Sequence, residues 1–524
     1  MIIEKDRIFI LSTKETGCVL AITRHGHLEQ VHYGARVGDE NPEPLRHKQT
    51  AVLGSQVLYD NDDKTYCLDA IPLAWSGIGK GDYRQSPCEI LMPDLSYVSD
   101  FVYESHRILK GTIPMKSLPS AYAKEEDCES LEIRLRDEAN GLTLLLIHTV
   151  FPDADVITRR TVLRNSSDKP AVIRKLMSLS IDLPYQGDRV VSFHGGWIRE
   201  AHPQDVPLPF GLFVREGTTG ASGNRHNPGF LIAEQGASET FGNVYGFNLI
   251  YSGNHYSGVE RSEGGLFRVM TGISPSCFSW PLAPGEEFET PEAVMTFSAS
   301  GINGVSGHFH DFVNEHIVRG DWKGKERPVI LNNWEADFFD FTEKSLLRLA
   351  KRAKKTGAEL FVLDDGWFGE RNSDEKGLGD YSVNRKKLPG GLDRLSERIE
   401  RMGMKFGLWF EPEMVNPDSD LFRAHPEYAV SVPGRQPAFG RNQLVLDLCN
   451  KEVRDYIVRS VRGILDGAHI SYVKWDMNRH ISDMYSPVLP DQGMFSHRYI
   501  LGLYEVLGRI FGDRPDILVE TCSS

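Results

Sequence analysis

The stretch ISYVKWD (470–476) decides the fold class of the second half of this chain. Its β-branched and aromatic residues predict a buried strand that ends in Lys474, Trp475 and Asp476. Because side chains alternate across a strand, Lys474 and Asp476 lie on one side and Trp475 on the other. A buried strand that brings two opposite charges to one point indicates a polar site at its carboxyl end.

Four other apolar segments of the second half have the same character. They are PVILNNW (328–334), ELFVLDDGW (359–367), KFGLWFEPEM (405–414) and DILVETCSS (516–524). A helical pattern precedes each later segment, and this alternation predicts a parallel sheet, either doubly wound or a (β/α)8 barrel. Polar residues follow all five strands, which favours a barrel, because a barrel carries its active site on that face.

The predicted barrel has only five β/α units in this sequence, over residues 326–524. We therefore expect an incomplete (β/α)8 barrel. Five parallel strands by themselves would leave two open edges, which is unfavourable. Residues 1–300 contain short alternating segments separated by turn signals such as DEANG (137–141), which predict a large antiparallel sandwich. Residues 301–325 have a helical apolar rhythm and are expected to be a linker.

Composition excludes several classes of protein. The formal net charge of −14 argues against a nucleic-acid partner, which needs a basic surface. No apolar run approaches the roughly 18–20 residues that cross a membrane, and the N-terminus has no signal-peptide core. Seven scattered cysteines without a C-x-x-C pair are typical of reduced thiols rather than of disulfides or a zinc site. These features predict a cytoplasmic protein without a bound metal.

The carboxylates at the predicted strand ends have a structural and a chemical interpretation. Asp476 and Lys474 are either a structural ion pair or a nucleophile whose charge the lysine maintains. Asp364 and Asp365 either cap a helix or accept hydrogen bonds from sugar hydroxyls. The second pair is also a candidate for calcium or magnesium, but no D-x-D-x-D-G loop follows it.

Aromatic residues and two further acids lie beside these carboxylates in the predicted sheet. Trp334, Trp367 and Trp409 either pack in the core or form an apolar platform for a sugar ring. Glu411 and Glu413 are alternate residues, expected on one face, where either is a candidate acid or orients a neighbour.

Five motifs of the second half resemble those of the bacterial α-galactosidases of glycoside hydrolase family 36. These motifs are NNWEA (332–336), LDDGWFG (363–369), GLWFEPEMV (407–415), KWDMNR (474–479) and ETCSS (520–524). In the first half, STKETG (12–17), GDYR (81–84), HNPGF (226–230) and VYGFNLIYSGNH (244–255) resemble the β-supersandwich domain of that family. The resemblance extends in order over essentially the whole chain.

The resemblance implies a retaining α-galactosidase that removes α-1,6-linked galactose from raffinose-type oligosaccharides or melibiose through a covalent galactosyl-aspartate. It makes Asp476 the nucleophile and Asp364 and Asp365 the ligands of the galactose 4- and 6-hydroxyls. The other substrate-binding residues that it implies are Trp334, Trp409, Arg441, Lys474, Asn478 and Cys522. It implies no cofactor, a galactoside as the partner, and a homo-oligomer, often a tetramer.

The sequence departs from the family pattern at two places. The acid/base aspartate of the family lies downstream of the ETCSS motif, so we expect this chain to be truncated, to lack its proton donor and to be impaired or inactive. IPLAWSG (71–77) also differs from the usual family motif, which places any substrate contact from that loop in doubt. The alternatives are a non-catalytic galactoside-binding fragment, an α-N-acetylgalactosaminidase or a galactosyltransferase.

Overall fold

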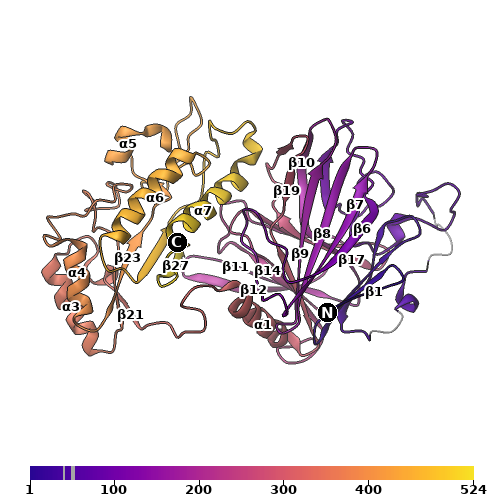
Figure 1. Cartoon of the computed structure of the whole chain (residues 1–524), viewed down its shortest axis with the longest axis horizontal. Helices are drawn as coiled ribbons and strands as arrows, with labels where there is room; N and C mark the ends of the chain where they lie inside the picture. The colour runs from indigo at the N-terminus through magenta and orange to yellow at the C-terminus, as the bar shows by residue number, and fades with distance from the viewer. Residues whose placement is uncertain (39–41, 49–53, 524) are drawn as a thin grey trace. The chain divides into compact units, whose positions relative to one another are not determined.

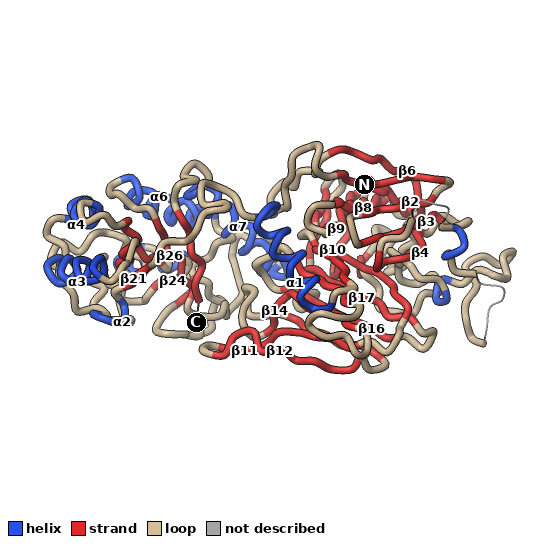
Figure 2. Tube along the Cα trace, turned by 90° about the horizontal axis from the view of Figure 1, so that it is seen from below, coloured by secondary structure: helices blue, strands red, loops and turns tan. Residues whose placement is uncertain are grey.

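The computed structural model describes residues 1–38, 42–48 and 54–523. The chain divides into two compact units, Met1–Val318 and Arg319–Ser524. The boundary between them lies inside the segment expected to be a linker. The first unit consists mostly of strands, and the second alternates strands and helices (Figure 1; Figure 2).

The first unit contains three antiparallel sheets. The largest has ten strands and runs β12 (Arg199–Pro207), β11 (Arg189–Gly196), β14 (His226–Ala233), β15 (Val244–Leu249), β20 (Ala293–Ser298), β9 (Val156–Asn165), β8 (Leu142–Phe151), β7 (Glu129–Asp137) and β6 (Val102–Lys110), with β19 (Glu287–Glu289) paired to β9. The second runs β13 (Gly211–Glu216), β16 (His255–Arg261), β17 (Leu266–Ile273), β10 (Ala171–Pro184) and β18 (Trp280–Leu282), with β5 (Cys88–Leu91) paired to β10. The third runs β1 (Ile2–Lys5), β2 (Ile8–Ser12), β3 (Thr16–Ile22) and β4 (Leu28–Ala35). The predicted antiparallel, sheet-rich first half is confirmed.

The first helix, α1 (Gly301–Phe312), differs from the expected linker. It belongs to the first unit, where Val305 and Phe312 are buried. Gly246 of β15 permits this close packing, because a Cβ atom there would lie 2.4 Å from a methyl group of Val305. The apolar rhythm of this segment therefore packs a helix on the sandwich, and a short π-helical turn (Val313–Ile317) follows it.

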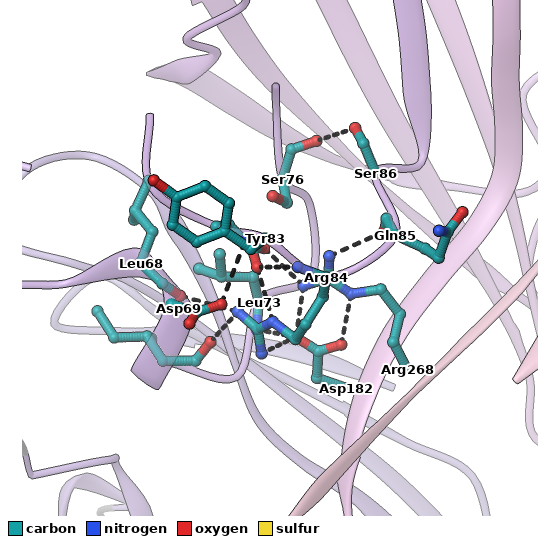
Figure 3. Close-up of polar contacts among 12 residues, drawn as sticks. Leu68, Asp69, Leu73, Ser76, Tyr83, Arg84, Gln85, Ser86, Asp182 and Arg268 are labelled. Atoms are coloured by element: carbon teal, nitrogen blue, oxygen red, sulfur yellow. Dashed lines mark hydrogen bonds and ion pairs between the residues drawn. The ribbon is translucent and has the colours of Figure 1, made fainter. Parts of the chain in front are cut away.

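A buried cluster of four charges holds the loop of the GDYR motif against the second sheet (Figure 3). Arg268 contacts Asp182 through Nε at 2.7 Å and Asp82 through Nη2 at 2.9 Å, while Arg84 contacts Asp82 at 2.8 Å and Asp182 at 2.9 Å. Burial raises the pKa of Asp82, but the two guanidinium groups outweigh burial and hold it at about 2. Tyr83, between Asp82 and Arg84, is 72% exposed.

The second unit contains a five-stranded parallel sheet. Its strands are β21 (Ile330–Asn332), β22 (Leu360–Leu363), β23 (Lys405–Phe410), β26 (Tyr472–Met477) and β27 (Leu518–Ser523), in that order. The helices that precede the last four strands are α3 (Glu343–Lys355), α4 (Gly391–Glu400), α6 (Lys451–Asp466) and α7 (Phe495–Phe511). All five predicted strands and all four predicted helices are present. The strands follow chain order without the reversal of a doubly wound sheet, so the order is that of a barrel; the extent of the barrel stays a prediction.

Local sequence explains these elements. Thr342 and Ser345 form a capping box at the start of α3, and the Asn450 side chain accepts the Glu452 N–H at the start of α6. Short elements fill the connections: α2 (Trp334–Asp337), α5 (Asp420–Ala424), the antiparallel pair β24 (Met414–Val415) and β25 (Leu444–Val445), and the 3-10 turns Glu43–Leu45, Leu68–Ala70, Pro426–Tyr428 and Gln492–Met494.

Within the residues described, no helix combines the length and the apolar character that crossing a membrane requires. All seven cysteines lie in the described ranges and are free thiols.

Candidate functional site

The carboxyl ends of the parallel strands bring most of the predicted site residues together. In the register of the sheet, Lys474 lies opposite Trp409 on one side, and Asp476 lies opposite Cys522 on the other. Asp364 directly follows β22, and its Oδ2 atom contacts Nζ of Lys474 at 3.0 Å. Side chains from three separate strands therefore converge on one edge of the sheet.

Asp476 is buried, with 5% of its surface exposed, and uncharged donors hold its carboxylate. Its Oδ2 atom accepts hydrogen bonds from Trp409 Nε1 at 2.9 Å and from Asn478 Nδ2 at 2.8 Å. Its Oδ1 atom accepts the backbone N–H of Met477 at 3.0 Å. Two side-chain donors thus orient Oδ2, whereas Oδ1 accepts a backbone N–H.

Lys474 forms its ion pair with Asp364, not with Asp476 as the sequence led us to expect. Burial lowers the pKa of Lys474, but Asp364 and, more weakly, Asp476 raise it, so the net shift is upward. The physical reason is reach: the long lysine side chain extends to the end of β22, two strands away in the sheet. Trp409 and Asn478 take the place that the lysine was expected to occupy beside Asp476.

Asp364 and Asp365 are adjacent in sequence but have different partners. Asp365 accepts a forked contact from Arg371, with Nε at 3.0 Å from Oδ1 and Nη2 at 2.8 Å from Oδ2. Burial raises the pKa of Asp365, and Arg371 opposes that shift. Arg371 also donates to Asn416 Oδ1 at 2.9 Å, and this second contact holds the guanidinium group in place against Asp365. Arg371 was not predicted from the sequence, although it lies six residues after Asp365 in the same loop.

Glu411 and Glu413 lie in different environments, so the expectation that they share one face is wrong. Oxygens of Glu411 accept the backbone N–H of Asn478 at 2.8 Å and Nε2 of Gln443 at 3.0 Å. Oxygens of Glu413 accept Nε1 of Trp475 at 3.0 Å and the hydroxyl of Tyr499 at 2.9 Å. Strand β23 ends at Phe410, so strand alternation no longer applies to these two residues.

The three tryptophans also differ in role. Trp409 is 2% exposed and donates to Asp476, so it is a hydrogen-bond donor rather than an open platform. Trp367 is fully buried, and its Nε1 donates to the carbonyl oxygen of Trp409 at 3.0 Å. Trp334 is half-buried and meets Phe338 and Phe339 edge-on. Of the three, Trp334 has the most exposed side chain.

Two predicted residues lie at the margin of this group. Cys522 is half-buried opposite Asp476, and burial, together with the negative charge of Asp476, raises the pKa of its thiol to about 11. Arg441 is exposed in the turn that joins Gly440 to Gln443, with a φ angle of 51°. That turn reaches the site through Gln443, which contacts Glu411.

Metal chemistry has no prepared site in the described part of the chain, where no group of three or more His, Cys, Asp or Glu residues is arranged to hold an ion. The acids of the site are engaged by lysine, arginine, indole and amide donors instead. Carboxylates held by such donors can still accept hydrogen bonds from sugar hydroxyls, and one of them can act as a nucleophile.

A sheet-rich first unit, followed by parallel strands with carboxylates at their carboxyl ends, defines a multidomain glycoside hydrolase. The model of the glycosyl hydrolase family 36 N-terminal domain matches residues 26–283, and the Melibiase model matches residues 287–524. The chain belongs to the family 36 α-galactosidases, as the motifs predicted.

Individual relatives agree with this assignment. Alpha-galactosidase AgaA of Geobacillus stearothermophilus is 39% identical over 98% of this chain and 71% of its own length. Alpha-galactosidase Mel36A of Lactobacillus acidophilus is 38% identical over 99% of this chain and 71% of its own. The crystal structure of AgaA matches with a TM-score of 0.96, covering 98% of this chain and 72% of its own. AgaA variants have also been solved in complex with raffinose and with stachyose.

Proposed function

We propose that this chain hydrolyses terminal α-1,6-linked galactose from raffinose-type oligosaccharides or melibiose, with retention of configuration. One observation carries the proposal: two side-chain donors orient Asp476 Oδ2 at the carboxyl end of β26, and Oδ1, which accepts the backbone N–H of Met477, is the proposed nucleophile. The AgaA complexes with raffinose and stachyose support the choice of substrate class.

The reaction has two displacements. In the first, Asp476 Oδ1 forms a bond to C1 of galactose, the bond from C1 to the leaving oxygen breaks, and that oxygen takes a proton from water. In the second, a water oxygen bonds to C1 and releases a proton to the solvent, the bond from C1 to Asp476 Oδ1 breaks, and the carboxylate regains its charge. Trp409 and Asn478 stabilise that returning charge, because both donate to Oδ2.

Retention also needs a proton donor about 5–5.5 Å from the nucleophile. We do not assign this role to Glu411, although it is an acid close to Asp476. It is only 1% exposed, and its two oxygens accept hydrogen bonds from Asn478 and Gln443, so it faces its neighbours rather than a leaving group. The proposal therefore assigns the nucleophile and the sugar ligands, and it assigns no residue as the proton donor.

Galactose is selected through its axial 4-hydroxyl. That hydroxyl and the 6-hydroxyl bind Asp364 and Asp365, which Lys474 and Arg371 hold in place. A glucose ring would leave a buried carboxylate without its donor, a penalty of roughly 1–3 kcal/mol. Trp334 lies against the apolar face of the sugar.

Three other residues complete the proposed sugar site. Asn478 and Arg441 bind the substrate, and Cys522 lines the floor of the site near the 2-hydroxyl and the 4-hydroxyl. A homo-oligomer, with a tetramer as its expected form, rests on family likeness and is tested by light scattering of the purified chain. A cytoplasmic location stays a prediction from the sequence.

Covalent trapping tests the proposal. A 2-fluorinated galactoside with an activated aryl leaving group needs little protonation, so it isolates the step that Asp476 performs. We expect one galactosyl adduct per chain, located by peptide mapping on Asp476, and none in the Asp476→Asn variant. An adduct on any other residue would overturn the assignment. Galactose binding without any adduct would instead support the non-catalytic galactoside-binding alternative.

A further inference from the structure

Glu411 is a buried acid of the described site that the two displacements do not use. Glu411 follows β23 directly and is only 1% exposed. Its Oε1 atom accepts the backbone N–H of Asn478 at 2.8 Å. The side-chain Nδ2 of the same Asn478 donates to Asp476 Oδ2 at 2.8 Å. One residue therefore links the two carboxyl groups.

Through this link, Glu411 influences the position of the Asp476 carboxylate. The Glu411 contact fixes the backbone of Asn478, and the backbone determines where the Asn478 amide points. Asp476 Oδ2 then has two fixed donors, Asn478 and Trp409, so its carboxylate plane is defined. If Glu411 is removed, the backbone N–H of Asn478 loses its acceptor. One of the two donors that orient Asp476 is then no longer held in place.

The charges around Glu411 favour its neutral form. Burial, together with the negative charges of Asp476 and Asp365, raises the pKa of Glu411 to about 8, although the Asn478 N–H and Arg371 oppose that shift. Arg371 directs its fork at Asp365 rather than at Glu411. A further titratable neighbour, Tyr381, accepts the backbone N–H of Glu411 at 3.2 Å and is itself buried, with a pKa raised by burial.

Gln443 can accommodate a proton on Glu411. Its Nε2 donates to Glu411 Oε2 at 3.0 Å, and its Oε1 is buried without a hydrogen-bond partner in the described part of the chain. A half-turn of this amide brings Oε1 to the carboxyl group, where it accepts a hydrogen bond from the O–H of protonated Glu411. The Gln443 side chain thus matches either protonation state of Glu411.

We propose that Glu411 is a positioning residue, a neutral carboxyl group that orients the nucleophile Asp476 through Asn478 and keeps a second negative charge away from it. This inference rests on the proposed function of Asp476. Glu411 does not touch the substrate and transfers no proton in the reaction. Its contribution is the geometry and the electrostatic environment of the attacking carboxylate.

Three variants of the full chain test this role with an activated aryl galactoside. Glu411→Gln keeps the acceptor for Asn478 and mimics the neutral acid, so we expect kcat to stay close to that of the wild type. Glu411→Ala removes the acceptor, and we expect kcat to fall by about 10- to 100-fold with little change in KM. The matched control is Glu413→Ala, which removes an equally buried acid that contacts Trp475 and Tyr499 instead of Asn478.

The pH profile gives a readout that a merely structural role would not move. As pH rises through about 8, wild-type Glu411 loses its proton and a second buried charge faces Asp476. We therefore expect wild-type kcat to fall in that range, whereas Glu411→Gln keeps its rate to higher pH. A wild-type rate for Glu411→Ala, or the same alkaline loss in Glu411→Gln, would overturn the proposal. An equal loss of kcat in Glu411→Ala and Glu413→Ala would do so too.

Two further measurements separate this inference from the proposed function. The folded-state pKa of Glu411 lies above its ordinary 4.5, so the wild type loses stability relative to Glu411→Gln as pH rises from about 4.5 to about 8. Thermal unfolding checks this without any substrate, and a constant difference between the two chains contradicts the neutral-acid assignment. If the wild type forms no adduct at Asp476, the proposed function fails. If it does, and Glu411→Ala forms the adduct at the wild-type rate, only the positioning role fails.

Discussion

Replacement of Trp409 by phenylalanine separates two interpretations of this residue. The indole Nε1 donates to Asp476 Oδ2 at 2.9 Å, and phenylalanine removes this donor. Most of the packing survives, because the ring of Trp409 stacks on Phe368 with centroids 6.3 Å apart, and the contact from Trp367 is to a backbone carbonyl. The substitution therefore removes the indole N–H donor and keeps an aromatic ring beside Phe368.

The size of the effect follows from that one bond. A hydrogen bond to a charged group contributes about 1.5–3 kcal/mol. At about 1.4 kcal/mol for each factor of ten, kcat falls by roughly 10- to 150-fold. The loss falls mainly on the second displacement, where Asp476 departs as a carboxylate and the indole N–H stabilises its returning charge. We expect a burst of aryl alcohol followed by a slow steady rate.

Stopped-flow kinetics with an activated aryl galactoside measure the burst, and circular dichroism confirms that the variant is folded. Trp334→Phe is the comparison, because Trp334 is half-buried and its expected contribution is to KM. If Trp409→Phe raises KM and leaves kcat unchanged, Trp409 is a sugar platform, and its assignment as the donor to the nucleophile is refuted.

Three further predictions concern the charged clusters. Arg268→Met leaves Asp82 and Asp182 buried with one cation fewer, so the free energy of unfolding of the first unit falls by about 3–5 kcal/mol in urea denaturation. The pKa of Asp82 is about 2 instead of 3.8, so its contribution to the free energy of unfolding is present above pH 4 and is lost towards pH 2. The difference in free energy of unfolding between the wild type and Asp82→Asn therefore shrinks over that range. Arg371→Lys keeps the charge but not the fork on Asp365, so kcat/KM for galactosides falls by about tenfold or more.

Exposed residues provide the controls for these variants. Arg174→Met removes an exposed arginine of β10 and should leave the free energy of unfolding within about 0.5 kcal/mol of wild type. Lys386→Met breaks an exposed contact with Glu370 and should leave kcat/KM unchanged. Equal losses in a control and in its buried counterpart would contradict the reasoning about burial.

The order of elements was predictable because it depends on local periodicity. Alternating apolar residues and turn signals indicated the antiparallel first unit, and strands that alternate with amphipathic helices indicated the parallel sheet of the second. The helix at 301–312 shows where this approach stops. Its rhythm predicted a helix, but only the close approach at Gly246 shows that the helix packs on the sandwich instead of linking the units.

The sequence by itself determined which residues meet at the strand ends, because carboxyl ends of parallel strands share one edge of a sheet. It placed Asp364, Lys474 and Asp476 there before any coordinates. Only the tertiary structure decided how they pair: Lys474 with Asp364, and Asp476 with Trp409 and Asn478. The reason is physical, since backbone sterics set the periodicity of a strand residue by residue, whereas an ion pair or hydrogen bond depends on distances between strands that only the assembled sheet defines.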